Sequence, residues 1–305
     1  MNSQSSTCFA SPRMLAILVA SLGMLTALPS TATVVDGLSA SATTQVGSNL
    51  AVNSGPPDTT LPFATANVFD SDGASSGSAS SFGNTVGPYR ASGSGSGKFD
   101  STGSFIRTWD ITNDTAVAQH YGFNFFIYYG SLSASDNGAG GTGYAEYIAT
   151  IKQDAIQRFN SAARIDSNGT LTTAGSILDG AQLNGSSYFW DGTYVNVDLG
   201  ILTPGQSTSV VYDLVGHAFG DYGFSTGNCH GGYGYGEVAT FAVGYGDGEC
   251  TGSSYASLGD PDDLNDTPIP GIGISVTAVP EPASLGLLGM GLAALGLRRR
   301  RRPCG

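Results

Sequence analysis

Regular alternation of apolar and polar residues limits one stretch of this chain to a strand with a single buried face. In "YVNVDLGIL", residues 194 to 202, one face would carry Val195, Val197, Leu199 and Ile201, and the other Tyr194, Asn196, Asp198 and Gly200. A period of two residues is the spacing of a β-strand. The next residues, "TPGQ", place Pro204 and Gly205 at the centre of a type II turn. Because "STSVVYDLV" then alternates again, we predict a two-stranded hairpin.

Further stretches rich in β-branched and aromatic residues predict more strands. They are "FNFFIYY" (Phe123 to Tyr129), "EVATFAV" (Glu237 to Val243) and "IGISVTAV" (Ile272 to Val279). In "WDITNDTA" we predict a turn at Asn113-Asp114 between two others. The sequence therefore predicts a mainly β fold over residues 33–278, a single antiparallel β-sandwich of the jelly-roll or immunoglobulin-like type.

Two segments are harder to assign. Ser71 to Ser104 is rich in Gly and Ser and has few apolar residues, so we predict a long surface loop or a mobile segment. In residues 144–165 the apolar side chains fit both a helical period and an alternating one, and we favour strands because of the surrounding context.

A glycine-rich stretch precedes that ambiguous segment. "GAGGTG" (Gly138 to Gly143), with Asp166 about twenty residues on, matches the dinucleotide-binding pattern. Such a site needs the first Gly at the end of a strand and a helix after the loop, whereas "SLSASDN" intervenes here and no alternation of strands and helices follows. We therefore predict a glycine-rich loop.

The composition is typical of an exported protein. Charged residues make up 12% of the chain, about half the usual share of roughly 25% in globular domains, and only two residues are Lys. Between residues 33 and 279 there are 6 basic and 23 acidic residues, a net charge of −17. A surface of this sign repels phosphate backbones, so nucleic acid is not an expected partner.

The N-terminus predicts a secretory signal peptide over residues 1–32. Arg13 precedes an apolar stretch of 15 residues from Met14 to Leu28, and small residues then form a cleavage site. We expect signal peptidase to cut between Ala32 and Thr33 after export through the Sec machinery across the inner membrane.

The C-terminus combines three elements over residues 279–305. Pro280 and Pro282 keep the chain extended. The apolar stretch Ala283 to Leu297 would reach about 22 Å as a helix, which is short of a hydrocarbon core of about 30 Å. The positive-inside rule places the basic run on the cytoplasmic side of a short transmembrane helix; the run is Arg298, Arg299, Arg300, Arg301 and Arg302. We expect a transient membrane anchor.

Val279-Pro280-Glu281-Pro282, followed by the apolar stretch and the arginine run, resembles the PEP-CTERM sorting signal, whose tail also carries the label of an ice-binding protein C-terminal domain. The resemblance covers about the last 27 residues, and Pro303-Cys304-Gly305 departs from it because family members usually end at the arginines. It implies that exosortase, an integral membrane enzyme, recognises the tail and cuts near the motif. The label implies nothing about ice for the rest of the chain.

Candidate sites in the middle of the chain are few. Cys229 and Cys250 are the only cysteines there, and an oxidising compartment favours a disulfide between them. His217, near Asp213 and Asp221, is a candidate site, but we favour a surface histidine or one with satisfied hydrogen bonds. We find no catalytic motif, although two acids brought together by folding would leave no sequence spacing.

Two further ligand classes were considered. The acidic stretches "DPDDLNDT" (Asp260, Asp262, Asp263 and Asp266) and "DSDG" (Asp70 and Asp72) could hold calcium, but neither fits the twelve-residue calcium loop, and we expect no cofactor or metal. Trp109, Trp190 and the tyrosines could stack on sugars, although aromatic residues in a sandwich more often belong to the core.

Together these features predict a non-enzymatic exported protein of the cell surface or extracellular matrix, structural or associated with exopolysaccharide in a biofilm. A carbohydrate-binding or adhesive module is the first alternative, and a secreted hydrolase is the second.

Overall fold

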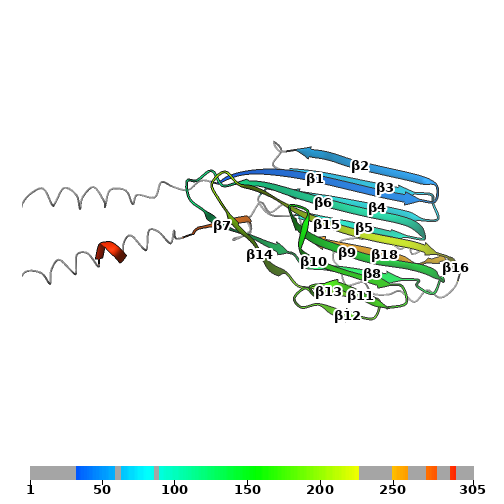
Figure 1. Ribbon diagram of the computed structural model, residues 1–305. Helices are drawn as coiled ribbons and strands as arrows, with labels where there is room; N and C mark the ends of the chain where they lie inside the picture. The colour runs from blue at the N-terminus through cyan, green and yellow to red at the C-terminus, as the bar shows by residue number, and fades with distance from the viewer. Residues whose placement is uncertain are drawn as a thin grey trace, which may run out of the picture.

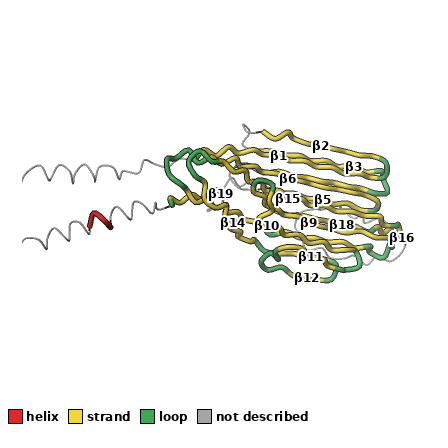
Figure 2. The backbone as a smooth tube through the Cα atoms, viewed as in Figure 1, coloured by secondary structure: helices red, strands yellow, loops and turns green. Residues whose placement is uncertain are grey.

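Antiparallel β-strands make up nearly all of the computed structural model, which describes residues 32–58, 63–85, 89–226, 249–259, 273–279 and 289–292. Figure 2 shows strands in yellow throughout the body and a short helix in red at 289–292. The mainly β prediction is therefore confirmed. The signal peptide lies outside the described residues, apart from Ala32, and no helix in the described part of the chain is long and apolar enough to span a membrane.

Two seven-stranded sheets form the body (Figure 1). The first sheet contains, in spatial order, β11 (Leu171–Gly175), β10 (Ile156–Asp166), β9 (Gly141–Gln153), β15 (Ser207–Tyr222), β6 (Lys98–Thr112), β1 (Thr33–Val46) and β2 (Asn49–Asp58). The second sheet contains β12 (Gln182–Asn184), β13 (Ser187–Trp190), β8 (Gly130–Ser135), β18 (Ser253–Gly259), β5 (Tyr89–Ser96), β4 (Ser76–Asn84) and β3 (Phe63–Ser71). This arrangement agrees with a β-sandwich, while the finer jelly-roll or immunoglobulin-like assignment stays a prediction.

Two smaller sheets complete the structure. A three-stranded sheet contains β14 (Thr193–Leu202), β7 (Gln119–Ile127) and β19 (Gly273–Ala278). A two-stranded sheet contains β16 (Phe224–Thr226) and β17 (Glu249–Thr251). The predicted strand at 237–243 lies outside the described residues.

Large aromatic and aliphatic side chains fill one part of the space between the sheets. They come from alternate positions of the strands, as the two-residue period requires. The largest fully buried ones are Trp190, Tyr121, Tyr147, Tyr212, Tyr222, Phe105, Phe123, Phe125, Leu38, Ile111, Ile127 and Leu132. Trp109 and Trp190 are 4% and 2% exposed, so both belong to the core and are not available to stack on sugars.

In the other part of the sandwich the two sheets lie very close together. The prediction of a loop or mobile segment at Ser71–Ser104 is wrong. That segment forms β4, β5 and the start of β6. A Cβ atom on Gly93 of β5 would lie 2.2 Å from the carbonyl oxygen of Ser101 in the opposite sheet, and one on Gly103 would lie 2.3 Å from that of Ser80. Small residues are therefore needed here because the two backbones nearly touch. Composition suggested a loop, but the same small residues permit close packing of sheets.

Serine pairs join β4 to β5 on the outer face of the second sheet. The hydroxyls of Ser76 and Ser96 lie 3.0 Å apart, those of Ser78 and Ser94 2.9 Å, and those of Ser80 and Ser92 2.8 Å. Cross-strand hydrogen bonds of this kind stabilise neighbouring strands. The hydroxyl-rich sequence therefore forms ordered sheet.

The ambiguous segment 144–165 is two strands, as we favoured. β9 and β10 pair through a tight turn in which Asp154 and Ala155 have φ values of 48° and 68°. Residues 138–140 of the glycine-rich stretch form a loop, as predicted, but Gly141 to Gly143 already belong to β9, so the stretch leads into a strand and not into a helix.

The predicted hairpin at residues 194–215 is wrong, although its turn forms. Gln206 N donates to Thr203 O at 2.9 Å, but β14 then pairs with β7, whereas β15 pairs with β6 and β9 in the first sheet. A bulge between Asp198 and Gly200 also shifts the alternation of β14. Ile201 is consequently 54% exposed, while Leu202 is buried.

Candidate functional site

The start of β1 and the end of β19 lie at the same end of the body (Figure 2), and both are bonded to the loop 113–118. The backbone N–H of Thr33 donates to Asp114 Oδ2 at 3.2 Å, and its hydroxyl donates to the same oxygen. The backbone N–H of Val279 donates to Ala118 O at 3.2 Å. The predicted signal cleavage position, Ala32–Thr33, and the first residue of the predicted tail are thus attached to one short loop.

Asn113 holds this loop in place. Its side chain is fully buried, and its amide donates to Val117 O at 2.9 Å and to Leu202 O at 2.8 Å. Its side-chain oxygen accepts from the N–H of Thr115 at 3.1 Å. The predicted turn at Asn113-Asp114 is confirmed, and these hydrogen bonds hold the loop to which both ends of the body are attached.

The other residues of the predicted sorting motif, the arginine run and one of the two cysteines lie outside the described residues. These are Pro280, Glu281, Pro282, Arg298 to Arg302 and Cys229. Cys250 is 6% exposed in β17 and is disulfide-bonded. Its pairing with Cys229 stays a prediction.

A second group of candidate residues forms a charge network on the outer face of the first sheet. His217 of β15 lies between two carboxylates, with Nδ1 2.8 Å from Glu146 Oε1 and Nε2 2.9 Å from Asp100 Oδ1. Asp213 and Asp221, the neighbours in the sequence, are not its partners. The partners come from β9 and β6, so only the strand pairing reveals them.

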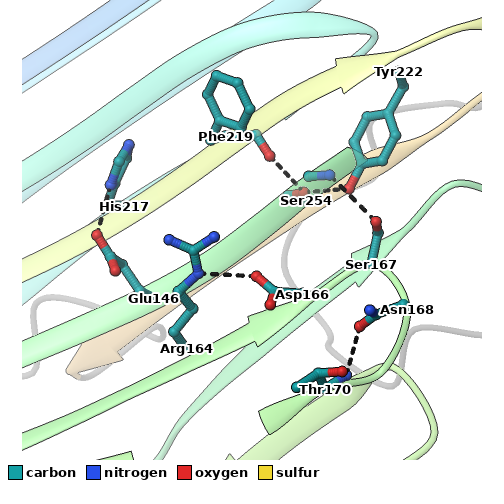
Figure 3. Close-up of polar contacts among 11 residues, drawn as sticks. Glu146, Arg164, Asp166, Ser167, Asn168, Thr170, His217, Phe219, Tyr222 and Ser254 are labelled. Carbon is teal, nitrogen blue, oxygen red and sulfur yellow. Dashed lines mark hydrogen bonds and ion pairs between the residues drawn. The ribbon is translucent and has the colours of Figure 1, made fainter. Parts of the chain in front are cut away.

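Arg164 extends the network onto β10 (Figure 3). It occupies the register position opposite Glu146, and its Nε lies 2.9 Å from Asp166 Oδ1. Its guanidinium carbon lies 3.5 Å from the ring centroid of Tyr144, which also stacks on Phe219 at 5.3 Å. Charges of alternating sign therefore cross four adjacent strands beside an aromatic pair.

The network leaves His217 poorly suited to act as a general base. Burial alone would lower the pKa of His217, but the hydrogen bonds and charges of Asp100 and Glu146 raise it to about 9. With a carboxylate on each nitrogen, the imidazolium is the favoured form and neither nitrogen has a free lone pair at neutral pH. The geometry fits the satisfied histidine that the sequence favoured.

The raised pKa predicts a stability that depends on pH. Below pH 6.5, the ordinary pKa of a histidine, the network contributes its full stabilisation. This stabilisation is lost as the pH rises through about 9, the pKa of His217 in the folded protein. After allowance for solvent screening we expect roughly 1–2 kcal/mol. Urea unfolding should therefore show His217→Gln to be less stable than the wild type at pH 6 but nearly equal to it at pH 10.

The control for this prediction is His120→Gln. His120 Nε2 lies 2.9 Å from Asp198 Oδ1, but the two side chains are 45% and 72% exposed, so this substitution should leave the stability nearly unchanged at both pH values. An equal loss for His217→Gln at pH 6 and pH 10 would contradict the charge network.

The acidic stretch at Asp70 and Asp72 forms a turn. Asp72 Oδ1 accepts from the N–H groups of Ala74 at 3.0 Å and Ser75 at 2.7 Å, and Asp70 Oδ1 accepts from Ser71 N at 2.8 Å. No group of three or more metal-binding side chains occurs among the described residues. The acidic stretch 260–266 lies outside them.

Comparison with known proteins supports the interpretation of the tail. Residues 278–301 match the PEP-CTERM protein-sorting motif. No curated protein and no solved structure matches the chain. The match supports export and processing by exosortase, a membrane enzyme, with transient anchoring at the C-terminus.

Proposed function

We propose that this chain is a non-enzymatic protein of the cell surface or extracellular polysaccharide matrix, delivered there by its C-terminal sorting motif. The observation that carries the proposal is the motif match at residues 278–301, which begins where the last strand, β19, ends. The tail is therefore attached directly to the end of the folded body, and the expected cut lies next to that body.

The position of the two ends supports this role. Thr33 and Val279 are both bonded to the loop 113–118, so a signal peptide and a C-terminal anchor would leave the body toward one membrane. The body could then fold on the outer side while both segments were still inserted. The two expected cleavage positions would face the same membrane surface.

A structural role agrees with the chemistry of the described residues. The conspicuous histidine, His217, is held by Asp100 and Glu146, and the aromatic face of Tyr144 carries Arg164. These groups stabilise the sheet. A secreted hydrolase would instead need a proton donor or acceptor free to reach a substrate.

Association with extracellular polysaccharide is the finer part of the proposal. Tyr144 and Phe219 form a stacked, partly exposed pair beside the charge network. Aromatic side chains with polar neighbours suit contact with sugars. Because Arg164 covers the face of Tyr144 and Phe219 stacks on the same ring, a carbohydrate-binding or adhesive module would contact the exposed parts of this pair rather than a free face of Tyr144.

The test is mass spectrometry of the membrane-bound and released forms, combined with fractionation of the released form. We expect the released form to begin at Thr33, to lack the arginine run, and to sediment with extracellular polysaccharide. Pro280→Ala combined with Pro282→Ala should leave the tail on the membrane-bound form. Release of a chain with an intact C-terminus would refute the sorting role, and release without polysaccharide would refute the matrix association alone.

A further inference from the structure

β19 is an edge strand that is weakly attached. Among the residues that the structure describes, it pairs only with β7, from Gly273 opposite Asn124 to Ala278 opposite Gln119. Ile274 packs partly against the core, but residues 275–278 are exposed. Within the described part of the chain, its side chains add the hydrogen bonds of Ser275 to Gly122 O at 3.2 Å and of Thr277 to His120 O at 3.5 Å and no others. Edge strands with few buried contacts open at low free-energy cost.

The sorting motif and β19 overlap. The motif match begins at residue 278, the last residue of the strand, and Val279 is still bonded to Ala118 O. From Val279 to Ala283, where the apolar stretch begins, an extended chain reaches only about 14 Å. While β19 stays paired, Pro-Glu-Pro is confined between a folded body and the membrane.

A processing enzyme must enclose an extended peptide on both sides of the bond that it cuts. As long as Val279 is bonded to the loop 113–118, the folded body lies directly before the motif and leaves no room for the enzyme on the N-terminal side of the cut. If β19 leaves β7, Gly259 becomes the last described residue before the motif that is still paired in a sheet, and the 20 residues from there to Val279 have an extended length of about 65–70 Å. That length is ample for a membrane enzyme to fit between the body and the bilayer.

We infer that β19 is a releasable strand, and that the sorting tail is cut from the form in which β19 has separated from β7. This inference rests on the proposed sorting function. Gly273, at the start of the strand, has a φ of 128°, and a Cβ atom there would meet no atom within 4 Å. A glycine at this point leaves the backbone free to turn away from the sheet.

The experiment is a disulfide staple across the pair in the full chain, expressed in its own host. Gly122 lies directly opposite Ser275, and a Cβ atom on Gly122 would lie 2.7 Å from the Ser275 hydroxyl, so Gly122→Cys with Ser275→Cys can form a bond after that hydroxyl is removed. We expect at least a tenfold slower loss of the tail, measured by the mass of the C-terminus over time. A membrane-permeable reductant should restore the wild-type rate.

The matched control staples β7 to β14 instead. Asn124 and Asn196 are opposite each other in that pairing, so Asn124→Cys with Asn196→Cys adds a similar bond and leaves β19 free. This variant and the single-cysteine variants should lose the tail at the wild-type rate. Processing of the β7–β19 staple at the wild-type rate would overturn the inference while leaving the sorting function intact. A wild-type chain that keeps its tail would overturn both.

A loosened strand tests the same inference in the opposite direction. Ile274→Ser removes the apolar contact of β19 with the core and should speed removal of the tail about threefold. The urea midpoint of the purified variant should match that of the wild type, which excludes general unfolding as the cause. Unchanged or slower processing of a variant with that midpoint would contradict a strand that must be released.

Discussion

Replacing Gly103 by Ala should destabilise the protein by about 3 kcal/mol or more. The added Cβ would lie 2.3 Å from Ser80 O, 2.5 Å from Ser92 O and 2.8 Å from Ser92 N. All three are backbone atoms of the second sheet, so the contact can be relieved only by moving the sheets apart. Gly103 has no positive φ, and the effect therefore measures close approach and not backbone strain.

Urea unfolding of the purified protein is the measurement, and Gly55→Ala is the matched control. Gly55 also lies in a strand of the first sheet and has no positive φ, but its nearest neighbour to an added Cβ is 3.9 Å away. It should change stability by no more than about 0.5 kcal/mol. Equal stabilities for the two variants would mean that the sheets are further apart at Gly103 than the structure has them.

The same close approach explains where prediction from the sequence failed. In residues 144–165 the apolar pattern fitted both a helix and a strand, and the strands in the surrounding sequence correctly favoured a strand assignment. Ser71–Ser104 was assigned to a loop because its inward positions are Gly, Ala and Ser, which carry almost no apolar signal. Small residues are required at these positions only because the other sheet lies against them. The local sequence does not indicate the distance between the two sheets.

The candidate sites also differ in whether a local sequence pattern is enough to find them. The sorting tail is a linear pattern, so order and spacing were enough to find it, and the family comparison matched it. The partners of His217 are 71 and 117 residues away in the chain. The turn after β14 was also recognised, but a turn does not determine whether the strands on its two sides pair with each other. The partners of His217 and the strand partners of β14 and β15 both depend on pairing between strands that are distant in the sequence.

Replacing Asp36 by Asn should cost about 3 kcal/mol, because it leaves a buried guanidinium without its counter-charge. Arg107 is only 9% exposed in its side chain and points between the sheets. Its Nε lies 3.0 Å from Asp36 Oδ1, its Nη2 donates to Thr85 O at 2.9 Å, and its guanidinium carbon lies 4.5 Å from the ring centroid of Trp109. The planar group is held on three sides, so it cannot turn outward to reach water.

Urea unfolding can separate two quantities: the stability lost when one partner of this ion pair is removed, and the stability lost when both partners are replaced by apolar residues. The double variant Asp36→Leu with Arg107→Met should regain most of the stability that Asp36→Asn loses, since an apolar replacement leaves no buried charge. Asp221→Asn breaks the exposed pair with Lys98, whose side chains are 59% and 65% exposed, and should cost less than about 0.5 kcal/mol. If Asp36→Asn lowered the free energy of unfolding no more than Asp221→Asn does, the Asp36–Arg107 pair would be in contact with water and not buried.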